Sequence, residues 1–370
     1  MTELVKVPRG LAGVSVSDTK ISKSGADGSL LYRGYAISEI AANAGFEETA
    51  YLLLHGRLPK RAELDEFSNE LRREAMVDGK VFSIMKELGS RAHPIDVIRT
   101  ATSALGSIER RASISEEQSS IESKMSVLAA NSLGVPRGND PVLPMEDLGF
   151  ASRLLRMLKG SDSSVYESWV FERVLIFYLE HDMNASTFTV RVVASTQADP
   201  YAAAVAGLSA LKGPLHGGAN EAAMDMLLEV RDPAKASQFV DSSLIAGKKI
   251  MGFGHRVYKD FDPRSRLCKQ YLRELVNERE DSRWLYDLCD AIEIEMWERK
   301  KIPPNLDYYA APIFYVLGID VPLYTPIFAA SRVFGWMAHY NEQLDDNKLI
   351  RPDSTYIGPK DLKYTPIERR

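Results

Sequence analysis

Apolar residues recur at helical spacing along most of the chain. Residues at positions i, i+3, i+4 and i+7 lie on one face of an α-helix, so such a stripe predicts a helix that turns one side toward a core. Three stripes show the period most clearly: Leu64, Phe67 and Leu71; Val170, Val174, Phe177 and His181; and Leu285, Leu288, Ile292 and Met296. The pattern therefore predicts a mostly helical protein.

One short stretch near the start follows a different pattern. Residues 14–24 and 30–33 flank the turn sequence Gly25-Ala26-Asp27-Gly28, which is typical of a β-hairpin. No segment repeats at a fixed period, so a helical solenoid has little support. We expect an all-α fold of enzyme size with one short N-terminal β-hairpin.

Length and charge narrow the class of protein. A chain of 370 residues exceeds the roughly 250 to 300 at which one core usually stops growing, so we expect two domains. A composition of 45% hydrophobic and 26% charged residues is that of an ordinary globular protein. The net charge of -5 and the pI near 5.8 argue against non-specific binding to nucleic acid or to an anionic membrane.

The N-terminal sequence and the cysteines bear on the cellular compartment. Residues 1–10 lack the apolar stretch of a signal peptide, and no run approaches the roughly 18 apolar residues of a membrane span. Cys268 and Cys289, the only cysteines, occupy apolar positions of expected helices and lack the close spacing of metal or redox motifs. We expect a cytoplasmic protein with two reduced, buried cysteines.

A histidine among glycines is the first candidate for chemistry. His216 lies in the segment Gly213-Pro-Leu-His-Gly-Gly-Ala-Asn220, directly before a stretch with a helical pattern. Glycines give the backbone room to bend and let a ligand approach. The positive end of a helix dipole disfavours protonation, so this imidazole can stay neutral and donate a hydrogen bond to a developing oxyanion. The segment alone is equally compatible with a turn that carries an incidental histidine.

A second glycine-flanked histidine follows further along the chain. Gly252 and Gly254 bracket Phe253 directly before His255, which lets backbone amides approach a flat or anionic ligand. The third glycine of a dinucleotide fingerprint is absent and no βαβ pattern surrounds the segment, so we reject a Rossmann domain. A cluster of cations, which is also typical of a solvated helix face, follows at Lys259, Arg264 and Arg266.

An acidic residue opens a later apolar helix. Asp307 stands among Leu306, Tyr308 and Tyr309, and an aspartate at a helix start is most often an N-cap. Apolar neighbours would also desolvate the carboxylate and raise its affinity for protons, which suits a general base near neutral pH. Both interpretations remain open from this segment.

Arginines and one more histidine complete the candidates. Arg332 and Arg351 carry planar, forked donors that pair with carboxylates two bonds at a time, so arginines that converge on one pocket indicate an anionic substrate. His181 ends an apolar stripe. Without context, it is better explained as a core histidine whose hydrogen bonds are satisfied.

Five segments, taken in this order, resemble the citrate synthase family. They are residues 179–196 (LEHDMNASTFTVRVVAST), 213–220 (GPLHGGAN), 252–264 (GFGHRVYKDFDPR), 305–307 (NLD) and 349–358 (LIRPDSTYIG). The resemblance continues through residues 28–35 and 46–59, so it covers nearly the whole chain. The chain length and the hairpin are similar to the short bacterial and archaeal type of the family, whose members include 2-methylcitrate synthases.

The resemblance implies an all-α homodimer in which a smaller inserted domain closes over the substrates. By position, residues 1–217 and 319–370 would form the large domain and residues 218–318 the small one. The implied enzyme is an acyltransferase that converts the acyl group into alkyl on transfer. It condenses acetyl-CoA with oxaloacetate and water to give citrate and CoA, the entry step of the tricarboxylic acid cycle. The alternative within the family is a 2-methylcitrate synthase that uses propionyl-CoA.

The resemblance also implies a role for each candidate residue. His216 would stabilise the enol of acetyl-CoA, Asp307 would remove its methyl proton, and His255 would polarise the ketone of oxaloacetate. The oxaloacetate carboxylates would be held by His181, Arg264 and Arg332, and by Arg351 reaching in from the other subunit. Coenzyme A would contact Ile250, Met251, Gly252, Phe253, Gly254, Lys259 and Asn305. Acyl-CoA is a co-substrate here, and no metal, permanently bound cofactor, nucleic acid or membrane is implied.

Two hypotheses from other classes compete with this one. The pair His181-Asp182 in a helical chain is compatible with a metal-dependent phosphohydrolase of the HD type, with His216, His255 and Asp307 as further ligands. That hypothesis leaves the arginines and the glycine segments unexplained. A non-catalytic helical scaffold would show repeats and few charged groups at glycine-rich bends, and this chain shows the opposite.

Overall fold

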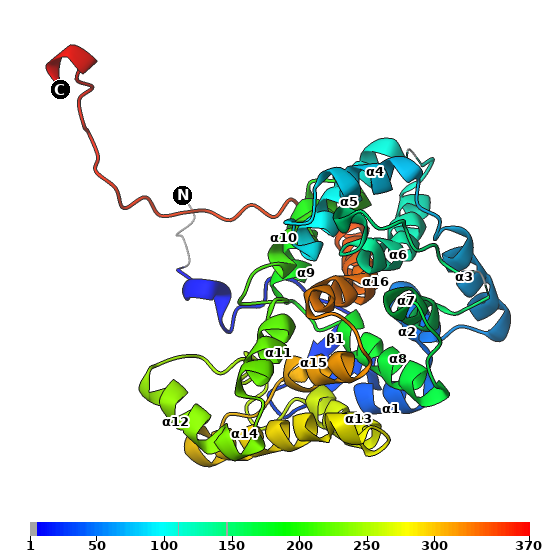
Figure 1. Ribbon diagram of the computed structural model, residues 1–370. Coiled ribbons are helices and arrows are strands. Elements are labelled where there is room, and N and C mark those ends of the chain that lie inside the picture. Colours follow the sequence, from blue (N-terminus) through cyan, green and yellow to red (C-terminus); the bar gives the residue numbers. More distant parts are fainter. Residues whose placement is uncertain (1–5, 110, 146) are drawn as a thin grey trace.

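A computed structural model of the chain describes residues 6–109, 111–145 and 147–370. Within these residues the chain forms sixteen α-helices and one sheet of three short strands (Figure 1). The prediction of an all-α fold with a short N-terminal hairpin is confirmed. Residues 1–5, which belong to the segment inspected for a signal peptide and to the predicted large domain, lie outside the described residues.

Short connections join most of the helices. In chain order the α-helices are α1 (Ile37–Asn43), α2 (Phe46–His55), α3 (Arg61–Arg73), α4 (Gly79–Glu87), α5 (Pro94–Ile108), α6 (Ile114–Asn131), α7 (Phe150–Lys159), α8 (Val165–Leu179), α9 (Ala185–Ser195), α10 (Pro200–Leu211), α11 (Ala219–Val230), α12 (Ala236–Ile245), α13 (Pro263–Asn277), α14 (Arg283–Lys300), α15 (Leu306–Val316) and α16 (Tyr324–Asp345). The single-turn 3-10 helices are η1 (Arg9–Leu11), η2 (Val135–Arg137), η3 (Pro233–Lys235), η4 (Glu280–Ser282), η5 (Val321–Leu323) and η6 (Ile367–Arg369).

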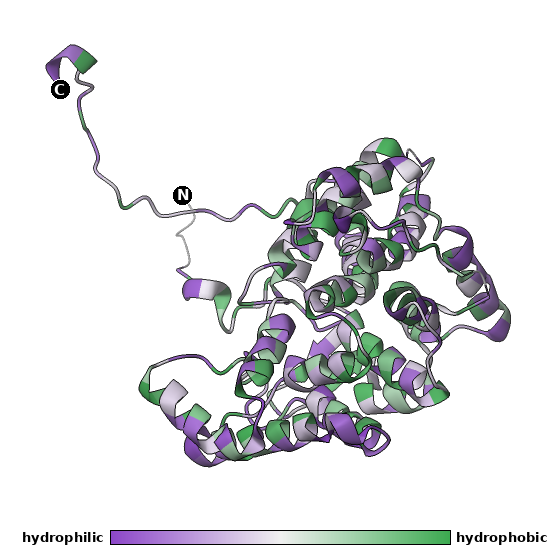
Figure 2. Cartoon of the chain, viewed as in Figure 1, coloured by the Kyte–Doolittle hydropathy of each residue, from purple (hydrophilic) through white to green (hydrophobic). Residues whose placement is uncertain are grey.

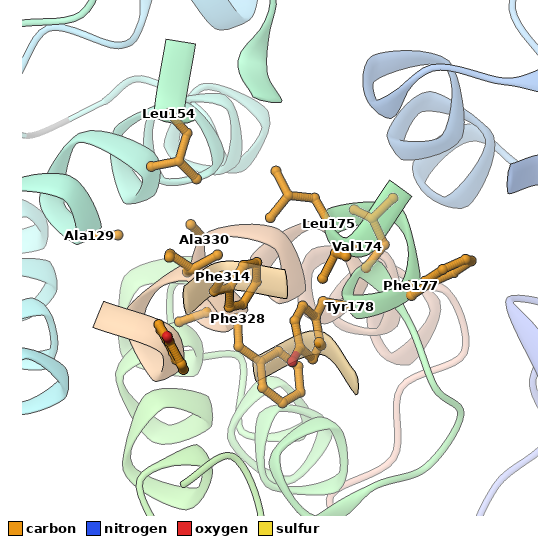
Figure 3. Close-up of a cluster of buried hydrophobic side chains, with 14 of the residues drawn as sticks. Ala129, Leu154, Val174, Leu175, Phe177, Tyr178, Phe314, Phe328 and Ala330 are labelled. Atoms are coloured by element: carbon orange, nitrogen blue, oxygen red, sulfur yellow. The ribbon is translucent and has the colours of Figure 1, made fainter. Parts of the chain in front are cut away.

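Helix α16 is the centre of the packing. It contacts α2, α5, α6, α8, α9, α10 and α11. In Figure 1 it runs through the middle of the upper group of helices. Nearly every residue from Tyr324 to Tyr340 is buried, as expected for a helix that others surround. Apolar side chains of α6, α7, α8, α15 and α16 share one core, part of which is drawn in Figure 3. This central helix carries the candidate residue Arg332.

Gly335 allows α16 to approach the end of α8. A Cβ atom at this position would lie 2.2 Å from the carbonyl oxygen of Leu179 and 2.7 Å from Oε2 of Glu180. Only glycine avoids this clash. The contact holds the segment that carries His181 against the helix that carries Arg332.

The predicted helical stripes are buried as expected, apart from Leu64, which is half-buried, but one stripe runs past the end of its helix. The buried members on α3 and α14 are Phe67, Leu71, Leu285, Leu288, Ile292 and Met296. On α8 they are Val170, Val174 and Phe177. This helix ends at Leu179, because Glu180 adopts an extended conformation with φ -150° and ψ 148°. His181 therefore lies beyond the helix, and the prediction that its stripe includes His181 was wrong.

The N-terminal hairpin is shorter than predicted and gains a third strand. Strand β1 (Ser22–Ser24) pairs antiparallel with β2 (Leu30–Tyr32), and β3 (Tyr35–Ala36) pairs with the other edge of β2. Residues 14–21 of the expected first strand lie outside the ladder. The hydroxyl of Tyr32 donates to the carbonyl oxygen of Glu180 at 2.7 Å, so the sheet braces the segment that follows α8.

Helices α11 to α15 lie in the lower part of the molecule in Figure 1, where α1 lies as well. Helix α15 packs against α11 and α13, while α12 packs against α14. Cys268 on α13 and Cys289 on α14 are free and buried, as predicted. Both α13 and α15 also contact α8, which connects this group to the central helices. These helices fall within residues 218–318, and the division of the chain into a small domain there and a large domain elsewhere stays a prediction.

The chain ends in an extension that leaves the helical body (Figure 1). After α16 the backbone is irregular up to the single turn η6, and residues 351–370 are exposed apart from Gly358. We call residues 346–370 the C-terminal extension. Among the described helices, none is long and apolar enough to cross a membrane.

Candidate active site

Six of the residues predicted to act in catalysis or to bind oxaloacetate line one cleft. The cleft has a volume of about 680 Å³. Its walls come from α8 and the segment that follows it, from α13, α15 and α16, from the loops before α11 and α13, and from parts of the N-terminal region. The six residues are His181, His216, His255, Arg264, Asp307 and Arg332. Titratable groups from distant parts of the sequence thus share one concave surface, which is typical of an active site.

His216 sits in the tight loop between α10 and α11. Its backbone N–H donates to the carbonyl oxygen of Gly213 at 2.8 Å, which closes the loop. The backbone N–H of Ser186, in the first turn of α9, donates to Nε2 of the imidazole at 3.3 Å, and Ser186 Oγ lies 2.8 Å from the same nitrogen. When Nε2 accepts a hydrogen bond, the neutral ring carries its proton on Nδ1.

The environment keeps His216 neutral. Burial, and then the guanidinium of Arg332, lowers the pKa of His216 to about 4. At that value only about one imidazole in a thousand is protonated at pH 7. The ring is therefore a neutral hydrogen-bond donor in the cleft, and it is not an incidental turn histidine.

His255 is held by the turn that follows it. The backbone N–H groups of Val257 and Tyr258 donate to its Nδ1 at 3.1 and 3.2 Å, so the neutral ring carries its proton on Nε2. Burial, and then the charge of Arg264, lowers the pKa of His255 to about 4. His216 and His255 are therefore neutral rings of opposite tautomers. Each keeps one N–H that these contacts do not use.

A short antiparallel bridge ties the segment before His255 to the segment before Asp307. Phe253 pairs with Pro304, and two backbone hydrogen bonds of 2.8 and 2.9 Å flank the pair. Gly252 adopts φ +82°, and a Cβ atom there would lie 2.8 Å from a neighbouring tyrosine side chain. Both its conformation and its surroundings therefore require glycine.

Asp307 lies in the first turn of α15, but it is not the N-cap. Asn305 caps the helix, because its Oδ1 accepts the backbone N–H of Asp307 at 3.1 Å. The N-cap interpretation of Asp307 was therefore wrong. The Asp307 carboxylate instead lines the cleft, where the hydroxyl of Tyr178 donates to Oδ1 at 3.1 Å.

Burial raises the pKa of Asp307 to about 6, while the hydrogen bond from Tyr178 acts in the opposite direction. At pH 7 roughly nine of ten such carboxylates are ionised. A base is most effective when its pKa lies close to the working pH, because it is then both ionised and strongly basic. The structure thus provides the desolvated acid that the apolar neighbours predicted.

Two buried arginines stand in the cleft wall. Arg264 pairs with Asp262 through two contacts, Nε to Oδ1 at 3.0 Å and Nη2 to Oδ2 at 2.8 Å. Arg332 donates from Nε to the carbonyl oxygen of Tyr178 at 2.6 Å, and its guanidinium carbon lies 4.7 Å from the centroid of the Phe328 ring. These contacts leave the two terminal nitrogens of Arg332 for an anionic ligand.

His181 is both a buried histidine and a cleft residue. Its Nε2 lies 3.0 Å from the hydroxyl of Tyr258, and its ring meets His255 edge-on with centroids 4.9 Å apart. Burial, and then the charge of Arg264, places the pKa of His181 well below its usual value. The description as a hydrogen-bonded core histidine fits, and its position also allows contact with a ligand.

Arg351 lies away from the cleft. Its side chain is 77% exposed on the C-terminal extension and lies 3.5 Å from Asp353. It borders a larger cavity of about 1350 Å³ between the extension and the N-terminal segment, which contains none of the six cleft residues. Within one chain the structure does not bring Arg351 to the other candidates. Its contribution from a partner subunit stays a prediction.

The residues predicted to contact coenzyme A lie in different environments. Gly254 and Asn305 line the cleft, and Asn305 Nδ2 donates to the carbonyl oxygen of Gly254 at 3.0 Å. Ile250 and Gly252 are buried, and Met251 and Phe253 are half-buried. These four residues would therefore contact a ligand mainly through their backbone.

The cations after His255 do not act as a group. Arg264 is buried in the cleft wall, whereas Lys259 is exposed and outside the cleft lining. Arg266 is exposed as well, with its guanidinium carbon 3.6 Å from the centroid of the Phe261 ring. The interpretation as a solvated face is thus correct for Lys259 and Arg266 and wrong for Arg264.

Sequence reasoning missed four residues that shape the cleft: Tyr178, Ser186, Tyr258 and Asp262. Ser186 follows Asn184, the N-cap of α9, and Asp262 caps α13 directly before a proline. Both have the signature of a helix start, which could have drawn attention to them. Tyr178 stands in an ordinary apolar run and Tyr258 between charged residues, and neither context gives such a signal.

The described residues contain no group of three or more His, Cys, Asp or Glu side chains placed to hold a metal ion. A metal ion would also need histidine ring nitrogens, and one nitrogen of each cleft histidine is already in contact with a protein group. Protein groups contact Nε2 of His181, Nε2 of His216 and Nδ1 of His255.

Comparison with known proteins points to one family. The family described as "Citrate synthase, C-terminal domain" matches residues 10–353. Citrate synthase 2 of Bacillus subtilis is 42% identical over 369 residues, which span 98% of this chain and 99% of that protein. A 2-methylcitrate synthase of Mycobacterium tuberculosis is 41% identical over 357 residues, which span 95% and 91%.

Solved structures agree over the full length. Citrate synthase of Thermoplasma acidophilum, solved as a ternary complex with carboxymethyl coenzyme A and oxaloacetate, matches with a TM-score of 0.93 and 32% identity, covering 99% of this chain and 100% of that one. Citrate synthase of Pyrobaculum aerophilum matches with a TM-score of 0.91 and 36% identity, covering 100% and 98%.

Proposed function

The chain belongs to the citrate synthase family, and from this premise we propose that it condenses acetyl-CoA with oxaloacetate and water to give citrate and coenzyme A. One observation carries the proposal: a carboxylate base, two neutral imidazole donors and two buried arginines converge on a single cleft. Such a set can take a proton from carbon, stabilise an oxyanion and bind a dicarboxylate. Family membership decides against the metal-dependent phosphohydrolase and the scaffold.

Asp307 is the proposed base. The methyl group of a thioester is a weak carbon acid, so its proton leaves only if the enolate oxygen is stabilised at the same time. The Oδ1 atom of Asp307 accepts from Tyr178, so we assign proton removal to Oδ2. A pKa of about 6 keeps this carboxylate ionised at neutral pH.

His216 is the proposed donor to the enolate oxygen. Its Nε2 accepts from Ser186, which leaves the Nδ1 proton for the substrate. A neutral imidazole suits this step, because an imidazolium would lose its proton to Asp307 before it met the substrate.

His255, His181 and the arginines are proposed to hold oxaloacetate. The Nε2 proton of His255 would polarise the ketone, while His181, Arg264 and Arg332 bind the carboxylates. The enolate carbon then attacks the ketone carbon, and the ketone oxygen takes up one proton from the side of His255, which balances the proton that Asp307 removed from the methyl group. Holding both substrates in register can contribute up to about 7 to 11 kcal/mol to lowering the barrier.

Hydrolysis completes the reaction. Water attacks the thioester carbonyl, the carbon–sulfur bond breaks, and coenzyme A leaves as the thiol, with backbone of residues 250–254, Lys259 and Asn305 as its proposed contacts. We propose that residues 218–318 close over the cleft, which keeps water out until condensation is complete. We also propose a homodimer in which Arg351 completes the site of the other subunit.

The acyl group has a second candidate. The 2-methylcitrate synthase of M. tuberculosis is almost as similar to this chain as Citrate synthase 2 of B. subtilis, at 41% against 42% identity. One methylene in an apolar pocket changes specificity by only about 1 to 3 kcal/mol. The ratio of kcat/KM for acetyl-CoA and propionyl-CoA at saturating oxaloacetate decides between them.

The proposed activity is tested by following thiol release from acetyl-CoA with the purified protein. Release should require oxaloacetate, produce one citrate per thiol and survive treatment with a chelator. Thiol release without oxaloacetate, or activity that a chelator abolishes and a divalent cation restores, would contradict the proposal. Cell fractionation tests the accompanying proposal of a cytoplasmic enzyme of the tricarboxylic acid cycle.

A further inference from the structure

Tyr178 touches the proposed base and a proposed substrate arginine at once. Its hydroxyl donates to Oδ1 of Asp307 at 3.1 Å, and its carbonyl oxygen accepts from Nε of Arg332 at 2.6 Å. The residue lies in the penultimate position of α8 and lines the cleft. Nothing in the proposed reaction so far explains why a hydroxyl group faces the base.

The ring of Tyr178 is held rigidly. It is 1% exposed and stacks on Phe328, with ring centroids 4.3 Å apart and an interplanar angle of 25°. The ring of Phe314 lies beside it at 6.3 Å. Figure 3 shows the three rings gathered between α8, α15 and α16. A side chain packed in this way fixes the position of its hydroxyl without further support.

We propose that Tyr178 is a positioning residue for Asp307, whose hydroxyl holds Oδ1 and thereby presents Oδ2 to the substrate methyl group. This inference rests on the proposed function, because it takes Asp307 as the base. A carboxylate with one oxygen anchored cannot rotate, so its free oxygen stays in line with the proton that it removes. Tyr178 itself does not touch the reacting atoms.

The same hydrogen bond also sets how basic the carboxylate is. Burial raises the pKa of Asp307, and the largest opposing effect is the hydrogen bond from Tyr178. Charged groups from the neighbouring elements act in both directions: Arg264 at the start of α13 and Arg332 on α16 lower the pKa, whereas Asp262 before α13 raises it. Without the hydroxyl, the carboxylate would bind its proton more tightly.

Asn220 faces the Tyr178 hydroxyl from a third element, the first turn of α11. Its side chain is fully buried, and its Nδ2 has no hydrogen bond to another side-chain or backbone acceptor that the described residues provide. This amide can donate to the hydroxyl oxygen while the hydroxyl donates to Asp307. Such a hydrogen bond would connect the base to the helix that follows His216.

The substitution Tyr178→Phe removes the hydroxyl and keeps the ring stack. We expect kcat to fall roughly ten- to a hundredfold, the range for the loss of a hydrogen bond to a charged group. The KM for oxaloacetate should stay within twofold of wild type. The acidic limb of the kcat–pH profile should move to higher pH, and the deuterium isotope effect with methyl-deuterated acetyl-CoA should increase, because proton removal becomes slower.

Two further variants distinguish a loss of Asp307 positioning from a general loss of packing or stability. Tyr340→Phe removes an equally buried hydroxyl that donates to the carbonyl oxygen of Ala198 at 2.8 Å, outside the cleft lining, and should keep wild-type values. Replacement of Tyr178 by 3-fluorotyrosine keeps the hydroxyl as a stronger donor, so the acidic limb should move to lower pH. A structural role alone would not shift the limb in opposite directions in the two Tyr178 variants.

Infrared titration of the carboxyl band that disappears in Asp307→Asn tests the inference independently of turnover. The band of the Tyr178→Phe protein should titrate at higher pH than that of wild type. If the band titrates at the same pH in Tyr178→Phe and in wild type, and if kcat and the isotope effect are unchanged, the positioning role is wrong even if the enzyme condenses its substrates. If wild type fails to condense them, the proposed function fails, and the titration still decides whether Tyr178 tunes Asp307.

Discussion

The cleft and the C-terminal extension are built in opposite ways, although each carries an arginine proposed to bind the same ligand. Arg332 is 2% exposed, sits on the central helix, and is anchored by a 2.6 Å hydrogen bond. Arg351 is 77% exposed and lies 3.5 Å from a single aspartate of its own extension. One arginine is positioned before any ligand arrives, whereas the other has no such support among the described residues of its chain.

The difference fits the proposal that Arg351 completes the site of a second copy of the chain. In Figure 2 the ribbon of the extension shows hydrophobic positions, in green, among hydrophilic ones. Its large exposed apolar and aromatic residues are Leu349, Tyr356, Ile357, Leu362, Tyr364 and Ile367. Exposed apolar groups in such a row typically mark a contact surface. A second copy of the chain would cover them and carry Arg351 to a cleft.

The largest effect is expected inside the cleft. Asp307→Asn keeps the size of the side chain and removes the base, so kcat should fall by roughly 10²- to 10⁴-fold. Steady-state thiol release measures the loss, and calorimetry should show that oxaloacetate still binds. A variant with wild-type turnover would contradict the assignment of Asp307.

His216→Ala should have the next largest effect. Loss of one donor to a developing oxyanion lowers kcat by roughly 10²- to 10³-fold. The KM for acetyl-CoA should change much less, because the hydrogen bond strengthens mainly in the transition state. If KM rises and kcat does not fall, His216 serves binding alone.

Arg351→Ala tests the extension. A charged donor lost from a substrate carboxylate should raise the KM for oxaloacetate roughly ten- to a hundredfold. Arg369→Ala, on the same extension and equally exposed, is the matched control and should keep wild-type kinetics.

Mixing the Arg351→Ala and Asp307→Asn proteins sharpens this test. If sites are shared, one of the two sites in each mixed dimer is intact. Random mixing should then restore about a quarter of wild-type activity, measured at an oxaloacetate concentration far below the KM of the Arg351→Ala protein, where that protein alone contributes little. If each site is built within one chain, every site in the mixture carries a defect and no activity returns.

The exposed apolar residues should matter for assembly and less for chemistry. Ile357→Ser should raise the dissociation constant of the dimer about tenfold or more, because one fully buried aliphatic side chain contributes roughly 1.5 to 3 kcal/mol. Analytical ultracentrifugation measures the change, with Lys360→Ser as the control. An unchanged dimer would place the interface elsewhere.

The pH dependence of kcat should reflect the titration of a group in the cleft and not of any group in the C-terminal extension. The pKa of Asp307, raised to about 6, means that the ionised base is lost as the pH falls through 6, so kcat should drop about tenfold for each further unit. His216 and His255, with pKa values near 4, stay neutral over this range. A profile that is flat down to pH 5 would exclude Asp307 as the group that titrates.

The sequence predicted much of the fold and the members of the site, but not their arrangement. Periodicity located the helices, because each helix buries one apolar stripe. It extended α8 past Leu179, because an apolar stripe does not reveal the extended backbone conformation of Glu180. Glycine-flanked histidines and a desolvated aspartate were recognised from local chemistry. Tyr178 was missed because its role depends on a residue far away in the sequence that only the packing of α8 on α15 brings near.

The central claim is that Asp307 and His216 enolise the acyl group while His255 acts on the other substrate. A dicarboxylate without a ketone, such as malate, allows enolisation without condensation, so NMR can follow exchange of the acetyl-CoA methyl protons with deuterium from solvent. We predict exchange in wild type and in His255→Ala, and its loss in Asp307→Asn and His216→Ala. Undiminished exchange in Asp307→Asn would contradict the account.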